Sequence, residues 1–370
     1  MVAGLHRINL LLCMSYRRMY SVEYLPRLNQ LSIEIEGVVS NAVTGVRLEE
    51  ERLILISVEG HDPIKVESPI AFTSATPTSI NVQKSKLLIS LKVDPQLGSG
   101  SANDTDNGPE KWSCGWLNKH TSKMGSKNKF QFRCSNCQNQ LIDSFSFVFK
   151  DMPGDYWYEL MDFWHCHKPE NNQPSGKDYG ILKPKDDKTI IIGSFYLLQT
   201  VNSSLQLVEK SEEAIYICKI CHQVIGDRFQ NVIRLLKWKL NLAYGKESQT
   251  SISTYDPLLY AVNLFITKIQ SSALRKFIID VNEKRAFLWI LNIDIDVTID
   301  GRILPKCLKV LWFFNKNDEN VGNGYEKTEI LYKEVADNLL AALQNNTINS
   351  TVEIGSIKYQ VSYIPTLMTR

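Results

Sequence analysis

Two short stretches decide the fold: residues 129–137, KFQFRCSNC, and residues 213–221, EAIYICKIC. In each, a run with the alternating apolar pattern of a strand leads into two cysteines separated by two residues. A CxxC on a tight turn directs two thiolates at one point, and two such turns complete a tetrahedral zinc site with Zn–S distances of about 2.3 Å. The pairs lie far apart in the sequence, so we expect two hairpins that clasp one zinc ion through the four cysteines Cys134, Cys137, Cys218 and Cys221.

Two other interpretations of the CxxC pairs stay open. A redox dithiol usually sits at the start of a helix in a thioredoxin-like unit, but neither pair here precedes a helical pattern. The cysteines could also be reduced core residues. The remaining four of the eight cysteines are Cys13, Cys114, Cys166 and Cys307, and no secretory signal indicates a disulfide framework.

Cys166 stands between two histidines in residues 153–167, PGDYWYELMDFWHCH. The apolar residues of this stretch recur at helical spacing, which predicts a helix that ends near the cysteine. Three roles stay open for Cys166: packing at the helix end, a metal ligand together with His167, or a nucleophile beside a base. Neighbours on a helix point about 100° apart, so the adjacency of His165 and His167 does not by itself provide a catalytic contact.

Composition narrows the class of protein. The chain has 370 residues, a net charge of +2 and 44% hydrophobic residues, which is typical of a folded protein with more than one domain. A nearly neutral charge argues against direct nucleic-acid binding, and no apolar run reaches the roughly 20 residues of a membrane span. Composition therefore gives no strong case for a nucleic-acid or membrane partner.

The chain reads as an α+β protein that is mostly β. Alternating runs predict strands in the N-terminal unit, with Pro63, Pro69 and Pro77 in the turns between them. Two amphipathic helices are expected later, one capped by Asp256 and one over residues 327–346 with an apolar face that includes Leu331. The expected parts are an extension or disordered segment at 1–21, a β-rich unit at 22–95, a linker or disordered loop at 96–111, a zinc-binding CxxC region at 112–245, and an α+β C-terminal region at 246–370.

Several segments together resemble the HECT-like ubiquitin-conjugating-enzyme-binding family. They are FRCSNCQNQLI, PGDYWYELMDFWHCH, IIIGSFYLLQT, YICKICHQVIGD, AFLWILNIDI and KVLWFF, in this order, over roughly residues 130 to 315. The resemblance implies that the two CxxC pairs, Cys166 and His167 belong to the family pattern and that His165 does not. It therefore favours a ligand or functional role for Cys166 over plain packing.

The resemblance implies two functions of different classes. The first, which we favour, is a zinc-stapled interaction protein that supports pre-mRNA 3′-end cleavage and polyadenylation by binding a processing-factor subunit, in the nucleus and cytoplasm. The second is a ubiquitin-protein ligase that accepts ubiquitin from a conjugating enzyme through a thioester on Cys166 or Cys307. An acceptor thiol must be exposed, whereas Cys307 lies in what reads as a buried strand, and this favours the binding role.

Overall fold

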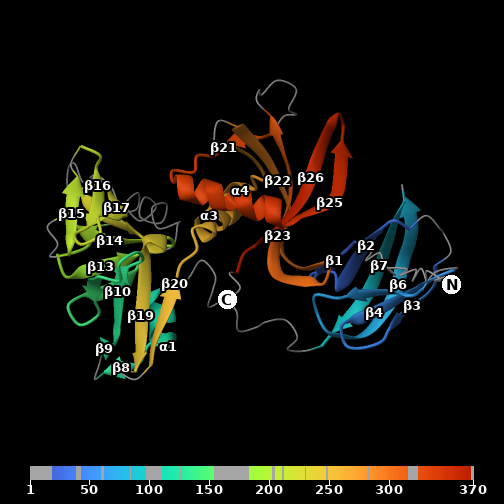
Figure 1. Cartoon of the computed structure of the whole chain (residues 1–370), viewed down its shortest axis with the longest axis horizontal. Coiled ribbons are helices and arrows are strands. Elements are labelled where there is room, and N and C mark those ends of the chain that lie inside the picture. The colour runs from blue at the N-terminus through green and yellow to red at the C-terminus, as the bar shows by residue number, and fades with distance from the viewer. Residues whose placement is uncertain are drawn as a thin grey trace, which may run out of the picture. The chain divides into compact units, whose positions relative to one another are not determined.

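Figure 1 shows the computed structural model of the chain, which is built mostly from β-strands with three α-helices among the described residues. The described residues are 19–38, 43–59, 62–83, 85–96, 111–124, 127–153, 183–201, 205–210, 212–229, 231–246, 249–281, 284–315 and 324–367. The chain divides into two compact units, one formed by residues 1–101 with 294–307 and the other by residues 102–293 with 308–370. The expectation of a mostly β, α+β fold is confirmed.

The first unit is a β structure with an apolar core. β1 (Tyr20–Leu25), β2 (Gln30–Glu36), β7 (Lys86–Pro95) and β6 (Phe72–Gln83) pair in this order as antiparallel neighbours. β3 (Val43–Leu48), β4 (Leu53–Val58) and β5 (Ile64–Glu67) form a second, three-stranded sheet. Alternate residues of the strands, such as Leu31, Ile33 and Ile56, are fully buried between them, as the period-2 pattern predicts.

One prediction for this unit is wrong. Pro63 and Pro69 flank β5 as expected, but Pro77 lies inside β6 rather than in a turn. β6 is an edge strand, and its pairing with β7 shifts register between Pro77 and Ser79. A proline that cannot donate to a ladder is tolerated at such an edge or bulge.

The cysteine-bearing part of the second unit contains two larger sheets. The four-stranded sheet has the order β11 (Gln140–Asp143), β10 (Phe130–Cys134), β19 (Leu240–Lys246), β20 (Gln249–Thr254). The seven-stranded sheet has the order β12 (Val148–Asp151), β13 (Thr189–Ile192), β14 (Tyr196–Thr200), β18 (Val232–Leu236), β17 (Val224–Phe229), β16 (Ile215–Cys218), β15 (Leu207–Lys210). Both sheets contribute to one apolar core that contains Cys134 and Cys218, and the short helix α1 (Cys114–His120) packs on it.

Smaller elements complete this part. The short strands β8 (Lys123–Met124) and β9 (Lys127–Asn128) form a hairpin, and a 3₁₀ turn at Lys237–Lys239 joins β18 to β19. Gly193 lies between β13 and β14. A Cβ at this glycine would lie 2.7 Å from the ring of Tyr196, so a larger residue here would require that ring to move.

The C-terminal part of the second unit packs two helices against strands. α3 (Leu258–Ser272) and α4 (Lys333–Asn345) enclose an apolar core with β21 (Lys276–Val281), β22 (Lys284–Ile299), β23 (Arg302–Asn315) and β26 (Ile357–Pro365). β25 (Thr347–Ile354) pairs with β26 at the edge, and the two-residue strand β24 (Glu326–Lys327) pairs with β21. The segments 294–299 of β22 and 302–307 of β23 belong to the first unit, where β22 pairs with β1.

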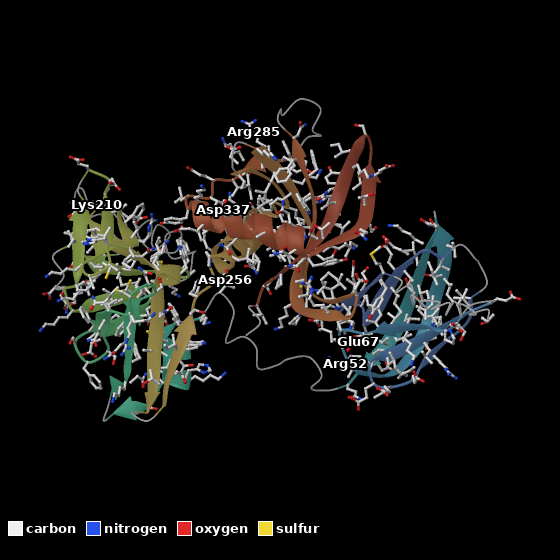
Figure 2. All side chains as sticks on the ribbon, in the orientation of Figure 1. Arg52, Glu67, Lys210, Asp256, Arg285 and Asp337 are labelled. Carbon is white, nitrogen blue, oxygen red and sulfur yellow. The ribbon has the colours of Figure 1, made fainter. Side chains whose placement is uncertain are left out.

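The two predicted helices form, with one difference. Asp256, labelled in Figure 2, accepts the N–H of Leu258 at 2.8 Å and so caps α3 as expected. On α4, Val335, Leu339 and Leu343 are buried, but Leu331 precedes the helix and is 56% exposed. The prediction is therefore wrong for Leu331. Tyr332 has an extended backbone and α4 begins only at Lys333, so Leu331 does not lie on the helix. None of the helices within the described ranges is long and apolar enough to cross a membrane.

Candidate metal centre

Each CxxC pair lies on the same kind of turn between two antiparallel strands. In the first, the N–H of Cys134 donates to the carbonyl of Asn139 at 2.9 Å, and the N–H of Gln138 donates to the carbonyl of Cys134 at 3.0 Å. The second turn repeats both bonds. The N–H of Cys218 donates to the carbonyl of Gln223 at 2.8 Å and that of His222 to the carbonyl of Cys218 at 2.9 Å. The two turns therefore present their thiols in the same way.

The likeness extends to backbone conformation and register. Gln138 and His222, which directly follow the second cysteine of each pair, both have a positive φ, 61° and 58°. The pairing of β10 with β11 shifts register after Phe132, and that of β16 with β17 shifts after Tyr216, two residues before the first cysteine in both cases. The same local geometry has been built twice, from different side chains.

The structure brings the four CxxC thiols together. Cys134 Sγ lies 3.6 Å from Cys221 Sγ, and Cys137 Sγ lies 3.7 Å from Cys218 Sγ. All four sulfur atoms lie within 4.8 Å of one another. Each hairpin contributes two thiols, and each short contact crosses from one hairpin to the other. The expectation that the two CxxC hairpins meet is confirmed.

These distances fit one metal ion at the centre. Four sulfur ligands at about 2.3 Å around a tetrahedral ion lie about 3.8 Å from one another. The two cross-hairpin distances are close to that value, and they are too long for the S–S bond of a disulfide, which is about 2.05 Å. The cluster is therefore suited to hold a metal ion, and the ion would join β10–β11 to β16–β17.

Electrostatics explains why a cation suits the cluster. Burial raises the pKa of Cys134 to about 12. The backbone N–H of Gln223 does the opposite for Cys221, whose pKa falls to about 6. The corresponding N–H of Asn139 donates to Cys137 at the same offset in the first turn and lowers its pKa, but burial and hydrogen bonds with Cys221 and Cys218 leave the pKa of Cys137 raised. The protein thus supplies donors for some thiolate charge, while a divalent cation is what allows buried Cys134 to ionise as well.

Sequence reasoning missed these backbone donors and one side chain. Asn139 Nδ2 lies 4.0 Å from Cys218 Sγ, so the first hairpin also contacts a thiol of the second. The signal that could have found the donors is the repeated spacing itself, because a turn that places two cysteines alike also places the N–H two residues later alike. Leu141 and Ile225, four residues beyond each pair, are both buried in the same core.

The redox interpretation of the CxxC pairs finds no support in this geometry. Both pairs lie in turns that lead into strands, β11 and β17, rather than at the start of a helix. The helix-terminal setting that activates a redox dithiol is therefore absent from both described CxxC turns.

The remaining candidate residues are not members of this cluster or are not described. Cys166 and His167, with the predicted helix that carries them, lie outside the described residues. Cys307 lies in β23 with no exposed surface, its Sγ 3.5 Å from the carbonyl of Leu304, and burial raises its pKa. A thiol in this setting is neither accessible nor ionised, so Cys307 as placed does not suit a thioester acceptor.

Cys114, which sequence reasoning did not single out, begins α1. Its backbone N–H donates to Asp151 Oδ1 at 2.7 Å, and its side chain lines a cavity of about 230 Å³ together with Leu117, Phe130, Phe147 and Phe149. Burial, together with the nearby Asp151 carboxylate, raises the pKa of Cys114 to about 12. Its thiol is therefore protonated at neutral pH and is a poor nucleophile.

Comparisons with known proteins agree with the family resemblance. A family model described as HECT-like ubiquitin-conjugating enzyme (E2)-binding matches residues 23–349. The chain is also 26% identical over 306 residues to the uncharacterized protein YJR141W of Saccharomyces cerevisiae. The aligned region covers 79% of this chain and 82% of the yeast protein. No solved structure matches the chain significantly.

Proposed function

Because the chain belongs to the HECT-like ubiquitin-conjugating enzyme (E2)-binding family, we propose that it is a binding protein for a ubiquitin-conjugating enzyme, held in shape by a zinc ion. The family model supports the binding partner, and the observation that carries the structural metal is the cluster of four CxxC thiols. It joins two hairpins whose cysteines are 81 or more positions apart, and so ties together the two sheets of the cysteine-bearing part.

The ligand set supports zinc and a structural role. Thiolates are soft ligands that favour zinc over magnesium or calcium, which prefer oxygen. Four protein ligands also complete a tetrahedral ion, which leaves no position for a metal-bound water or a substrate. The metal would therefore stabilise the fold and the binding surface rather than take part in a reaction.

A binding role is favoured over thioester chemistry by the placement of Cys307. The thiol is fully buried, and its raised pKa keeps it protonated. A ligase of the thioester type would then depend on Cys166, the other candidate that the family resemblance suggests. This ligase is the alternative function, and it makes a distinct chemical prediction.

The two functions separate in one experiment. A conjugating enzyme is charged with ubiquitin and mixed with the full chain, and the products are resolved with and without a thiol reductant. A binding protein retains the charged enzyme in a pull-down but shows no reductant-sensitive band at the combined mass of chain and ubiquitin. A band that persists in Cys307→Ser and disappears in Cys166→Ser would establish the ligase instead, with Cys114→Ser as the matched control.

The family resemblance supports a finer proposal about the setting. The family resemblance implies a role in messenger-RNA 3′-end cleavage and polyadenylation, so we propose a subunit of that machinery as a second protein partner. Tagged chain purified from cells should then co-purify with a cleavage-factor subunit in addition to the conjugating enzyme, and should be found in nucleus and cytoplasm. Absence of cleavage-factor subunits from the purified material would remove this partner and leave the binding of the conjugating enzyme intact.

A further inference from the structure

The outer edge of the four-stranded sheet is an open strand, β20, that pairs only with β19 among the strands that the structure describes (Figure 1). β20 has six residues, QTSIST, of which Thr250, Ser251, Ile252 and Thr254 are exposed. Ile252 is 57% exposed, although isoleucine is among the most often buried residues. An edge of this kind presents unpaired N–H and C=O groups to any extended chain that approaches it.

Proteins protect edge strands by charges, proline, bulges or short length. Every other described edge of the larger sheets carries such a device. β6 contains Pro77 and two register shifts, and β25 contains a register shift and a glutamate. β15 ends in Glu209 and Lys210, the latter labelled in Figure 2, and β12 ends in Lys150 and Asp151.

Three further edges follow the same rule. β11 has four residues and ends in Asp143, and β5 has four residues with Lys65 and Glu67. β3 has Arg47 and a register shift beside Gly45. β20 has no charge and no proline, and its pairing with β19 runs without a register shift from Gln249 to Thr254. It is the edge among these described strands that lacks every protective device.

The direction of the backbone groups on β20 follows from bonds on the other side of the sheet. The N–H of Ser135 donates to the carbonyl of Lys239 at 3.0 Å, so Lys239 faces β10. Hydrogen-bonding direction alternates along an antiparallel strand, so Leu242 and Tyr244 face β20. Their register partners on β20 are Ser253 and Ser251.

The remaining positions of β20 therefore face outward. Since Ser251 and Ser253 exchange hydrogen bonds with β19, the N–H and C=O groups of Thr250, Ile252 and Thr254 point away from the sheet. The side chains agree, because Trp112 Nε1 donates to Ser253 Oγ at 3.1 Å on one face while exposed Ile252 occupies the other. The edge thus offers three equally spaced donor and acceptor positions along about 20 Å of strand.

We propose that β20 is a docking site at which an extended, uncharged, β-prone segment of a partner protein adds as a fifth strand to this sheet. Main-chain hydrogen bonds to Thr250, Ile252 and Thr254 supply the binding, and an apolar partner residue beside Ile252 supplies the selectivity. The occupant is an extended segment rather than a second copy of this chain. Six strand residues bury far less than the roughly 1,200 Å² that a stable interface between two folded proteins needs.

The test uses peptides selected by the full, metal-loaded chain from a random decapeptide display library, followed by amide hydrogen exchange with one synthetic peptide. We expect the peptide to slow the exchange of the amides of Thr250, Ile252 and Thr254. The amides of Ser251 and Ser253 serve as an internal control, because their bonds to β19 protect them with or without the peptide.

Three variants of Ile252 sharpen the test. Ile252→Pro removes one outward N–H without removing a bond to β19, a place where an edge strand tolerates proline. It should weaken peptide binding at least about tenfold, as should Ile252→Lys, which adds the charge that other edges carry. Ile252→Val keeps the N–H and the branched apolar side chain and should bind within about threefold of the parent.

Three results would overturn the proposal. One is a library that yields no peptide protecting these three amides. Another is a peptide that binds Ile252→Lys as tightly as the parent chain. The third is concentration-dependent protection of the same amides in the chain alone, which would make a second copy the occupant of the edge.

Discussion

Removing the metal from the four-thiol cluster should strongly destabilise the cysteine-bearing part of the chain. The cluster joins two turns that lie 81 positions apart between Cys137 and Cys218. In the chain-entropy model, closing a loop of that length stabilises the folded state by about 4–5 kcal/mol. This is a large part of the roughly 5–15 kcal/mol by which a whole domain is stable, so the loss would not be a subtle one.

The assay is thermal unfolding with metal content measured in parallel. For a domain of 150–250 residues, 1 kcal/mol corresponds to about 2–4 °C, so chelation or Cys134→Ser should lower the melting temperature by about 10–20 °C. Cys134 is fully buried, so Cys134→Ser would remove one ligand inside the core. The other three cysteines would then lack the cation that balances their thiolate charge. Purified parent chain should contain about one zinc ion, and the Cys134→Ser chain none.

The matched control is Cys114→Ser, since Cys114 is a half-buried cysteine of the same unit outside the cluster. It should keep the metal and lose less than about 1 kcal/mol of stability. The reasoning is refuted if the metal-free parent chain melts at the same temperature as the metal-loaded chain. It is also refuted if Cys134→Ser retains its zinc.

The other predictions concern packing, charge and the contact between the cysteine-bearing part and the C-terminal part of the second unit. Gly226→Ala should lower the free energy of unfolding by more than about 3 kcal/mol, because the new Cβ would lie 2.1 Å from a backbone oxygen of β18. In the control Gly115→Ala the new Cβ meets only a side-chain atom at 3.8 Å, so this variant should be as stable as the parent or more stable, and urea unfolding compares the two. Burial raises the pKa of Asp296, so ionisation of this carboxyl opposes folding as the pH rises above the ordinary aspartate range. Asp296→Asn should therefore be more stable than the parent between about pH 4 and pH 7 but not below about pH 3. Melting curves at several pH values would reveal or contradict this difference. Tyr332→Phe should lower the free energy of unfolding by about 1–3 kcal/mol, because the Tyr332 hydroxyl donates to Asp227 Oδ2 at 2.8 Å. A double-mutant cycle with Asp227→Asn that shows no coupling would argue against a stabilising contact between the two parts of the second unit through this bond.

A cluster of aromatic side chains connects the cysteine-bearing part of the second unit to its C-terminal part. Phe195 and Trp238 pack against both apolar cores, that of the sheets and that of the helices. Arg234 forms a two-pronged ion pair with Asp227, at 2.8 and 3.0 Å, and its guanidinium lies 5.7 Å from the ring centre of Tyr332. None of these contacts follows a motif, so they could not be read from spacing.

Local patterns in the sequence determined the elements of this protein. The period-2 runs predicted β2, β4 and β7, and the apolar spacing with Asp256 predicted α3, because side-chain direction along a strand or helix depends only on the residues within it. The CxxC turns belong to the same class. Four residues and two backbone hydrogen bonds suffice to bring two thiols to one point, so both turns were predictable from their cysteines.

Only the tertiary structure decided which elements meet. It brought Cys134 next to Cys221 and Cys137 next to Cys218, placed Pro77 in an edge strand, and assigned residues 294–307 to the unit at the other end of the sequence. It also left the outer edge of β20 unpaired among the described strands. The physical reason is the same in each case: such pairings depend on the burial and hydrogen bonding of segments far apart in the chain, and the alternation or helical spacing within one segment contains no information about its partner.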